Sequence, residues 1–132
     1  MFNKRKQPPI RSLIADGSEI QGNLRFADGL RVDGAVIGDI RSNPEQPSIL
    51  VISETASVTG ETHADHVIIN GTIKGPVYAR LLELQPRARI DGDVHYSVLE
   101  MHQGAIIAGQ LRPMDAVEEK PALKLALAAN NQ

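Results

Sequence analysis

The sequence predicts an all-β solenoid, a fold in which short strands wind around one aliphatic core in successive stacked turns. A five-residue unit, apolar-x-Gly-x-apolar, recurs along most of the chain, which is typical of a repeat architecture. An alternating pair of apolar residues precedes each unit after the first, and turn-forming residues separate the two patterns. The 132 residues are 42% hydrophobic but include no Trp, two Phe and two Tyr, so the predicted core is aliphatic.

The glycine-centred units mark one strand of each predicted turn. Successive glycines are separated by 16, 22, 15, 17 and 17 residues. The long gap contains residues 41–48, whose two prolines and polar side chains predict an inserted loop. Only the third unit ends in a polar residue. The six units are Ile20-Gly22-Leu24, Val36-Gly38-Ile40, Val58-Gly60-Thr62, Ile73-Gly75-Val77, Ile90-Gly92-Val94 and Ile107-Gly109-Leu111.

The second pattern predicts another strand in each turn, because alternation with period two indicates a β-strand. The connections are too short for the helical crossovers of a doubly wound parallel sheet, which leaves a solenoid of two or three short strands per turn. We interpret the repeated glycines as architectural. The apolar pairs are Leu30/Val32, Leu50/Ile52, Val67/Ile69, Leu82/Leu84 and Leu99/Met101, with Ile14 in the first copy; the corners are Asp16-Gly17, Asp33-Gly34, Glu54-Thr55, Asn70-Gly71, Gln85-Pro86 and Gln103-Gly104.

Three regions are predicted: a basic leader at 1–11, a solenoid of about six turns at 12–112 and a tail at 113–132. Both flanking regions are predicted to be disordered, although 122–129 could form a short helix on a partner. Residues 16–112 carry eight basic and thirteen acidic side chains, a net charge of −5, whereas the leader is purely basic. The leader therefore has two open interpretations, a solvated terminus or a segment that contacts an anionic membrane surface. The membrane-binding residues would be Met1, Phe2, Lys4, Arg5 and Lys6.

Composition narrows the functional classes. The chain has no cysteine, which excludes disulfides and thiolate metal sites and suits a reducing compartment. No stretch approaches the 18 apolar residues of a membrane-spanning helix, and the basic start is followed by Pro8-Pro9 instead of the apolar region of a secretory signal. We expect a cytoplasmic protein.

No catalytic, metal or cofactor site is predicted. His63 and His95 occupy equivalent positions, but the turn between them carries Tyr78 there, so the two imidazoles should lie about 10 Å apart and cannot share a zinc ion. The remaining histidines are His66 and His102, and the carboxylates are scattered over outward positions. No glycine-rich phosphate loop precedes a helix. These observations predict a protein that is not an enzyme and binds no nucleotide.

The repeated units, the flanking apolar pairs and the leader Met1-Phe2-Asn-Lys-Arg-Lys6 resemble the bactofilins, a family of bacterial cytoskeletal proteins. The resemblance covers about residues 12–112. It implies a right-handed parallel β-helix with a triangular core that polymerises without nucleotide into non-polar filaments. It also implies a scaffold at the inner face of the cytoplasmic membrane that localises cell-envelope (peptidoglycan) or morphogenesis proteins.

Assembly through the ends also follows from the pattern. Solenoids usually protect their terminal turns, yet here both terminal turns expose apolar residues and unpaired strand edges, which template pairing with another chain. Like ends that meet would form two-fold contacts and a filament without direction. The predicted polymerisation interface comprises Ile14, Ile20, Leu24 and Phe26 at one end and Leu99, Met101, Ile107 and Leu111 at the other.

Two alternatives remain beside the scaffold. A left-handed β-helix acyltransferase-like enzyme would need a six-residue apolar repeat, and that step fails at every corner. A passive protein-binding module is the second alternative. Nucleic-acid binding would depend on the leader alone, and the acidic body opposes it.

Overall fold

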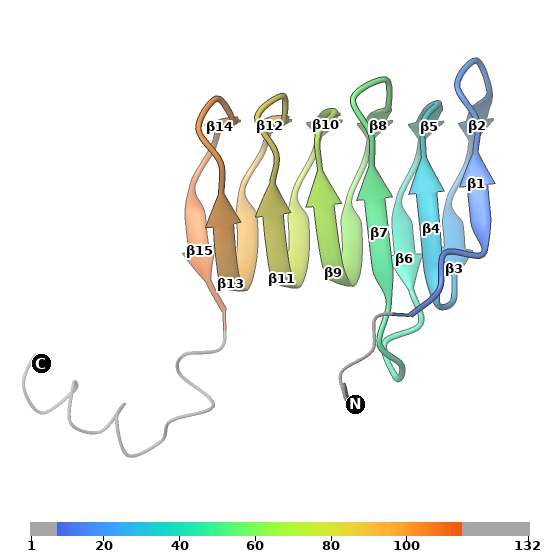
Figure 1. The fold of residues 1–132 in the computed structure, drawn as a ribbon, viewed down its shortest axis with the longest axis horizontal. Helices are drawn as coiled ribbons and strands as arrows, with labels where there is room; N and C mark the ends of the chain where they lie inside the picture. The colour runs from blue at the N-terminus through green and yellow to red at the C-terminus, as the bar shows by residue number, and fades with distance from the viewer. Residues whose placement is uncertain (1–7, 115–132) are drawn as a thin grey trace, which may run out of the picture.

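The computed structural model describes residues 8–114, which form fifteen strands wound into a parallel solenoid of six turns (Figure 1). The winding is right-handed, and successive turns stack along one axis into a short rod. This architecture confirms the predicted fold class. Within this described part, no helix is long and apolar enough to cross a membrane. The predictions for residues 1–7 and 115–132 fall outside the described residues.

Each turn contributes one strand to each of three faces, so the cross-section is triangular. The strands of face 1 are β1 (Ser12–Ile14), β4 (Gly29–Val32), β7 (Ile49–Ile52) and the C-terminal halves of β9 (Thr62–Ile69), β11 (Val77–Leu84) and β13 (Val94–Met101). Face 2 contains β2 (Glu19–Gln21), β5 (Ala35–Ile37), β8 (Ser57–Thr59), β10 (Thr72–Lys74), β12 (Arg89–Asp91) and β14 (Ile106–Ala108). Face 3 contains β3 (Leu24–Phe26), β6 (Ile40–Ser42), the N-terminal halves of β9, β11 and β13, and β15 (Leu111–Pro113).

The core consists of columns of aliphatic side chains held in register by parallel pairing. On face 2, Val36, Val58 and Ile73 pair directly and are 0% exposed. Face 1 stacks the predicted apolar pairs in two such columns, from Leu30 and Val32 onward. Similar side chains above one another fill a narrow core without voids, which explains why the chain needs few aromatic residues.

The repeated glycines stand at the corner between faces 2 and 3, and after the first of them, Gly22, a Cβ at each would collide with the backbone of the preceding turn. Gly75 has a φ of +145°, and a Cβ there would lie 2.1 Å from the carbonyl oxygen of Gly60. Gly60 stands in the same relation to Gly38. The glycines therefore allow consecutive turns to approach closely, as the architectural interpretation requires.

The inserted loop is shorter than predicted. Arg41 and Ser42 belong to β6, so the loop comprises residues 43–48. Parallel pairing with β3 keeps both residues in the sheet. Ser48, at the end of the loop, is 1% exposed, and its Oγ accepts a hydrogen bond from the backbone N–H of Asp65 at 3.0 Å.

Thr62, the polar exception in the repeat, points into the core. It occupies the face 3 column between Ile40 and Val77 and is 0% exposed. Its Oγ1 has no hydrogen-bond partner among residues 8–114. A buried hydroxyl without a partner lowers stability, because its hydration is lost and not replaced.

Replacing Thr62 by Val should therefore stabilise the protein. Valine has nearly the same shape and lacks the hydroxyl, so we expect the free energy of unfolding to rise by about 1 kcal/mol. Chemical denaturation followed by circular dichroism measures the change. The matched control is Thr59→Val on the exposed side of β8, which should change stability little. A destabilised Thr62→Val variant would indicate a hydrogen bond to the Thr62 hydroxyl.

His66 is buried although it does not belong to the β-helix core. It pairs with Ile49 and Leu81 on face 1 and is 9% exposed, and its Nε2 has no hydrogen-bond partner in the described part of the chain. Its backbone N–H donates to the carbonyl of Ser48 at 3.0 Å, which ties it to the inserted loop. Burial lowers the pKa of His66, against the opposing charges of Glu83 and Asp65.

Stability should therefore fall on acidification. Because the pKa of His66 in the folded state lies below its unfolded value, folding favours the neutral imidazole, and this stabilisation is lost as the pH falls below about 6.5 and through the folded value. His66→Leu removes the titrating group and replaces it with an aliphatic side chain like those of its neighbours Ile49 and Leu81. We expect a flatter dependence of the melting temperature on pH between 7.5 and 5 than in the wild type, and parallel curves would contradict this assignment.

Candidate functional site

The N-terminal end of the rod has the open apolar surface that the sequence predicts. Among residues 8–114, strands β1, β2 and β3 each pair with one neighbour only, β4, β5 and β6 respectively. Their outer edges therefore leave backbone donors and acceptors free. The four residues predicted for this end, Ile14, Ile20, Leu24 and Phe26, lie together on the last layer of the core and are half-buried.

The segment that enters β1 does not cover this end. The N–H of Arg11 donates to the carbonyl of Gly29 at 3.1 Å, and its guanidinium pairs with Asp28 at 3.0 Å. The chain before β1 thus runs back along the side of the rod (Figure 1). Pro8 lines a hollow beside the inserted loop.

The C-terminal end is more open than the N-terminal end. The C-terminal half of β13, with β14 and β15, forms its unpaired edge. Met101 and Leu111 are 45% and 49% exposed, whereas Leu99 and Ile107 are half-buried against the core. The structure therefore brings together all four residues predicted for this end.

Sequence reasoning missed Ile106, which is 53% exposed on the side of the last turn. Its register partner on β12 is Arg89, which itself pairs with Thr72. An apolar residue at a position that is polar in the three preceding turns was the available signal.

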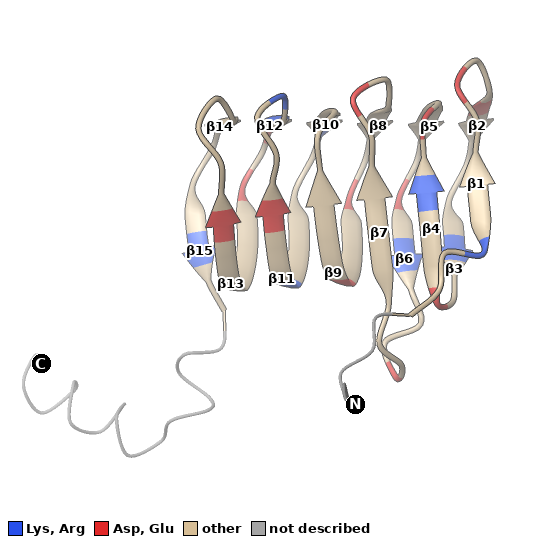
Figure 2. Cartoon of the chain, in the orientation of Figure 1, with Lys and Arg blue, Asp and Glu red and all other residues tan. Residues whose placement is uncertain are grey.

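A row of basic and aromatic side chains runs along the outside of face 3. The row is in register over all six turns: Arg25, Arg41, His63, Tyr78, His95 and Arg112. The three rings stack, with centroids 4.3 Å and 4.2 Å apart. Figure 2 shows the basic residues on β3, β6 and β15, while β11 and β13 carry acidic residues on face 1. The signal in the sequence was the residue directly after each glycine-centred unit.

The two histidines of this row are arranged as expected, with Tyr78 between them. Nε2 of His63 lies 2.9 Å from Oε1 of Glu61. Stacking and this contact account for their placement on the surface.

Most of the row's charge is balanced at the adjoining corner between faces 2 and 3. Arg41 contacts Asp39 and Glu61 at 3.5 and 3.3 Å, and Arg112 contacts Asp93 at 3.0 Å. The hydrogen bond from the N–H of Gln110, together with Arg112, lowers the pKa of Asp93. The charged form of Asp93 is therefore stabilised.

The same carboxylates connect successive turns. Oδ1 of Asp39 accepts the N–H of Glu61 at 2.9 Å, and Oδ1 of Asp93 accepts that of Gln110 at 2.9 Å. In the first turn Asn23 takes this place, and its Oδ1 accepts the N–H of Asp39 at 3.0 Å. An amide thus makes the same structural bond as a carboxylate but carries no charge.

One cluster has the donor atoms of a cation site. Glu83, Glu100 and His102 lie on face 1, with their ligand atoms within 4.8 Å of one another. Nε2 of His102 is 3.6 Å from Oε2 of Glu83 and 3.5 Å from Oε2 of Glu100. Sequence reasoning did not connect these residues, which the register pairing of Glu83 with Glu100 brings into contact.

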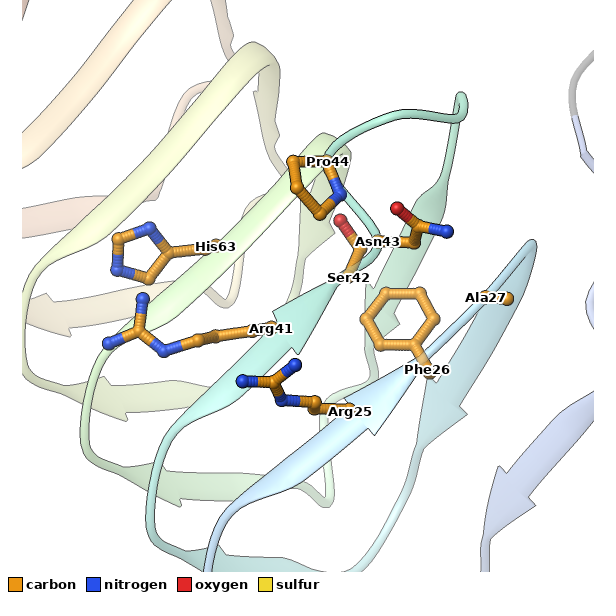
Figure 3. A pocket seen from close by; sticks show the side chains of 8 residues that line it. All are labelled: Arg25, Phe26, Ala27, Arg41, Ser42, Asn43, Pro44 and His63. Carbon is orange, nitrogen blue, oxygen red and sulfur yellow. The ribbon is translucent and has the colours of Figure 1, made fainter.

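Two open hollows adjoin the inserted loop. The first lies over β3 and β6 and is lined by Arg25, Phe26, Arg41 and His63, with Ser42 and Asn43 at its rim (Figure 3). The second lies beside it and includes Pro8 and Met114, the first and last described residues. The predicted membrane-binding residues precede Pro8 and lie outside the described range.

Comparison with known proteins agrees with this geometry. A family model for Bactofilin, described as polymer-forming cytoskeletal, matches residues 12–112, most of the chain. Comparisons with curated proteins and with solved structures gave no match. The matched range spans the solenoid from its first strand to its last. The chain belongs to the bactofilin family of polymer-forming cytoskeletal proteins.

Proposed function

We propose that this protein is a non-enzymatic scaffold whose rods join end to end into non-polar filaments, without nucleotide, at the inner face of the cytoplasmic membrane. There it localises cell-envelope or morphogenesis proteins. The main support for the proposal is the exposed apolar surface at the two rod ends. Each leaves three unpaired strands above apolar core residues, and the described chain covers neither end.

Backbone pairing between rods would supply both hydrogen bonds and burial. An unpaired strand edge templates another strand, and a second rod also covers the apolar layer beneath it. At the C-terminal end this layer includes Met101 and Leu111, each nearly half exposed. The end-to-end contact therefore removes apolar surface from water at the two places where the solenoid lacks a neighbouring turn.

The face 3 row disfavours head-to-tail stacking of the rods. If rods stacked head to tail in register, Arg112 of one rod would stand directly before Arg25 of the next. Like charges opposite each other across parallel strands are destabilising. A two-fold contact avoids this arrangement, and alternating N-terminal and C-terminal contacts give a filament without direction.

Membrane attachment fits the path of the chain. Pro8 and Met114 both line the hollow on the side of the rod. The leader can thus reach a membrane while both rod ends engage other rods. A filament would also multiply a weak contact by its number of subunits.

Electron microscopy of the purified protein without nucleotide tests the proposal. We expect filaments in the absence of ATP and GTP, and in the presence of a chelator. Leu111→Arg should prevent filament growth, because it brings two identical cations together across a two-fold C-terminal contact. The expected product is a folded dimer joined through the N-terminal ends, with intact β circular dichroism.

Two variants control this experiment. Val77→Arg buries a cation in the fourth turn, where Val77 is 0% exposed, and should unfold the protein at a cost of about 3–5 kcal/mol. Ser57→Arg places the same charge on the exposed side of β8, in the third turn and away from both rod ends, and should leave filaments intact. Normal filaments from Leu111→Arg would remove the C-terminal turn from the assembly surface.

Removing Met1–Lys6 should separate attachment from assembly. The deletion takes away three cations, each worth about 1 kcal/mol at an anionic surface, and should reduce sedimentation with anionic vesicles at least tenfold. Filament formation should continue, because both rod ends are retained. Vesicle binding equal to that of the wild type would show that the leader is not the attachment segment.

A further inference from the structure

Arg25 differs from the other arginines of the face 3 row in its surroundings. It is exposed, and no carboxylate contacts its guanidinium among residues 8–114, whereas Arg41 contacts two and Arg112 contacts one. The reason is Asn23, which makes the corner hydrogen bond to Asp39 without supplying a negative charge. The first turn thus keeps the structural bond and leaves a cation uncompensated.

This cation stands at the edge of a hollow with other groups suited to an anion. Arg25 and Arg41 are register partners on adjacent strands, which places them about 4.8 Å apart along the row. Figure 3 shows their guanidinium groups extending along the same side of β3 and β6, with His63 beyond them. Guanidinium groups on neighbouring strands can donate to separate oxygens of one phosphate group.

We propose that Arg25, assisted by Arg41, binds the phosphate of an anionic lipid headgroup and thereby places face 3 against the membrane. Arg25 supplies most of the attraction, since Arg41 is shared between Asp39 and Glu61. This inference rests on the proposed membrane attachment and adds to it a second contact, which fixes how the rod is turned about its axis.

Two observations favour a lipid over a soluble phosphate. The hollow containing Pro8 shares Ser42, Asn43, Pro44 and His63 with the hollow at Arg25, so the basic leader starts on the same side of the rod. Face 3 is also the one face whose outward row carries no carboxylate in the described structure, whereas Glu83 and Glu100 lie on face 1 and Glu19 and Asp91 on face 2. An anionic surface would repel the two carboxylates of face 1, whereas Lys74 and Arg89 offset the carboxylates of face 2, so face 3 suits such a surface best.

The test compares Arg25→Gln with Arg87→Gln in the full chain. Arg87 is exposed at the corner between faces 1 and 2, away from face 3. Each variant loses one positive charge, so the two variants differ in where that charge is lost. In sedimentation with vesicles of phosphatidylglycerol and phosphatidylcholine at low salt, Arg25→Gln should weaken binding about fivefold. Arg87→Gln should stay within about twofold of the wild type, because the field of its charge is screened over the width of the rod. Filaments and β circular dichroism should be unchanged in both variants.

Equal binding by the two variants would overturn the proposal, because the effect would then be one of net charge. Melting temperatures in inorganic phosphate distinguish the other source of the ligand. Suppose that inorganic phosphate raises the melting temperature of the wild type but not of Arg25→Gln, while the wild type and Arg25→Gln bind vesicles with equal affinity. The site then binds a soluble phosphate, and the lipid assignment is wrong. If deleting Met1–Lys6 abolishes vesicle binding and Arg25→Gln binds vesicles as the wild type does, the leader remains the attachment segment and the proposed Arg25 site is wrong. If the wild type does not bind anionic vesicles, both the leader attachment and the Arg25 site are wrong.

Discussion

The structure depends on one constraint, the exact parallel register between successive turns. Each backbone ladder fixes which side chains stack, so a column such as Val36, Val58 and Ile73 is dry only because its members are direct register partners. A one-residue slip would turn every such residue outward. The corner glycines permit the close approach that this register demands. Because each turn is completed by its neighbours, the first and last turns are necessarily incomplete, and the surface for assembly is a consequence of how the fold is stabilised.

The same register organises the outside of the rod into continuous rows. On face 3 it aligns six separate sequence positions into a row of cations and stacked rings. The adjoining corner balances this charge with carboxylates that also bond the next turn. Structural and electrostatic roles are therefore carried by the same side chains, except at Asn23, where they separate. That exception concentrates uncompensated positive charge at the first turn, near the point where the basic leader joins the rod.

Departures from the aliphatic repeat lie in the middle of the rod, where the surrounding turns support them. Thr62 and His66 are both buried within β9, and each has a polar atom without a hydrogen-bond partner in the described structure. Neither residue lies at a rod end. Their unsatisfied polar atoms lower the stability of the rod. The apolar surfaces at the two ends, which support assembly, are unaffected.

The sequence by itself determined the fold class, the strand positions and the composition of both rod ends, because a periodic pattern states directly which side chains face the core. Leu24 and Leu111 could be assigned to the ends from their repeat number alone. Only the tertiary structure decided what lies beside what across turns: the grouping of Glu83 with Glu100 and His102, the burial of His66 beneath the inserted loop, and the unpaired state of Arg25. These depend on side-chain geometry at corners and on where an irregular loop folds back. Periodicity carries no information about either, because both arise where the repeat is broken.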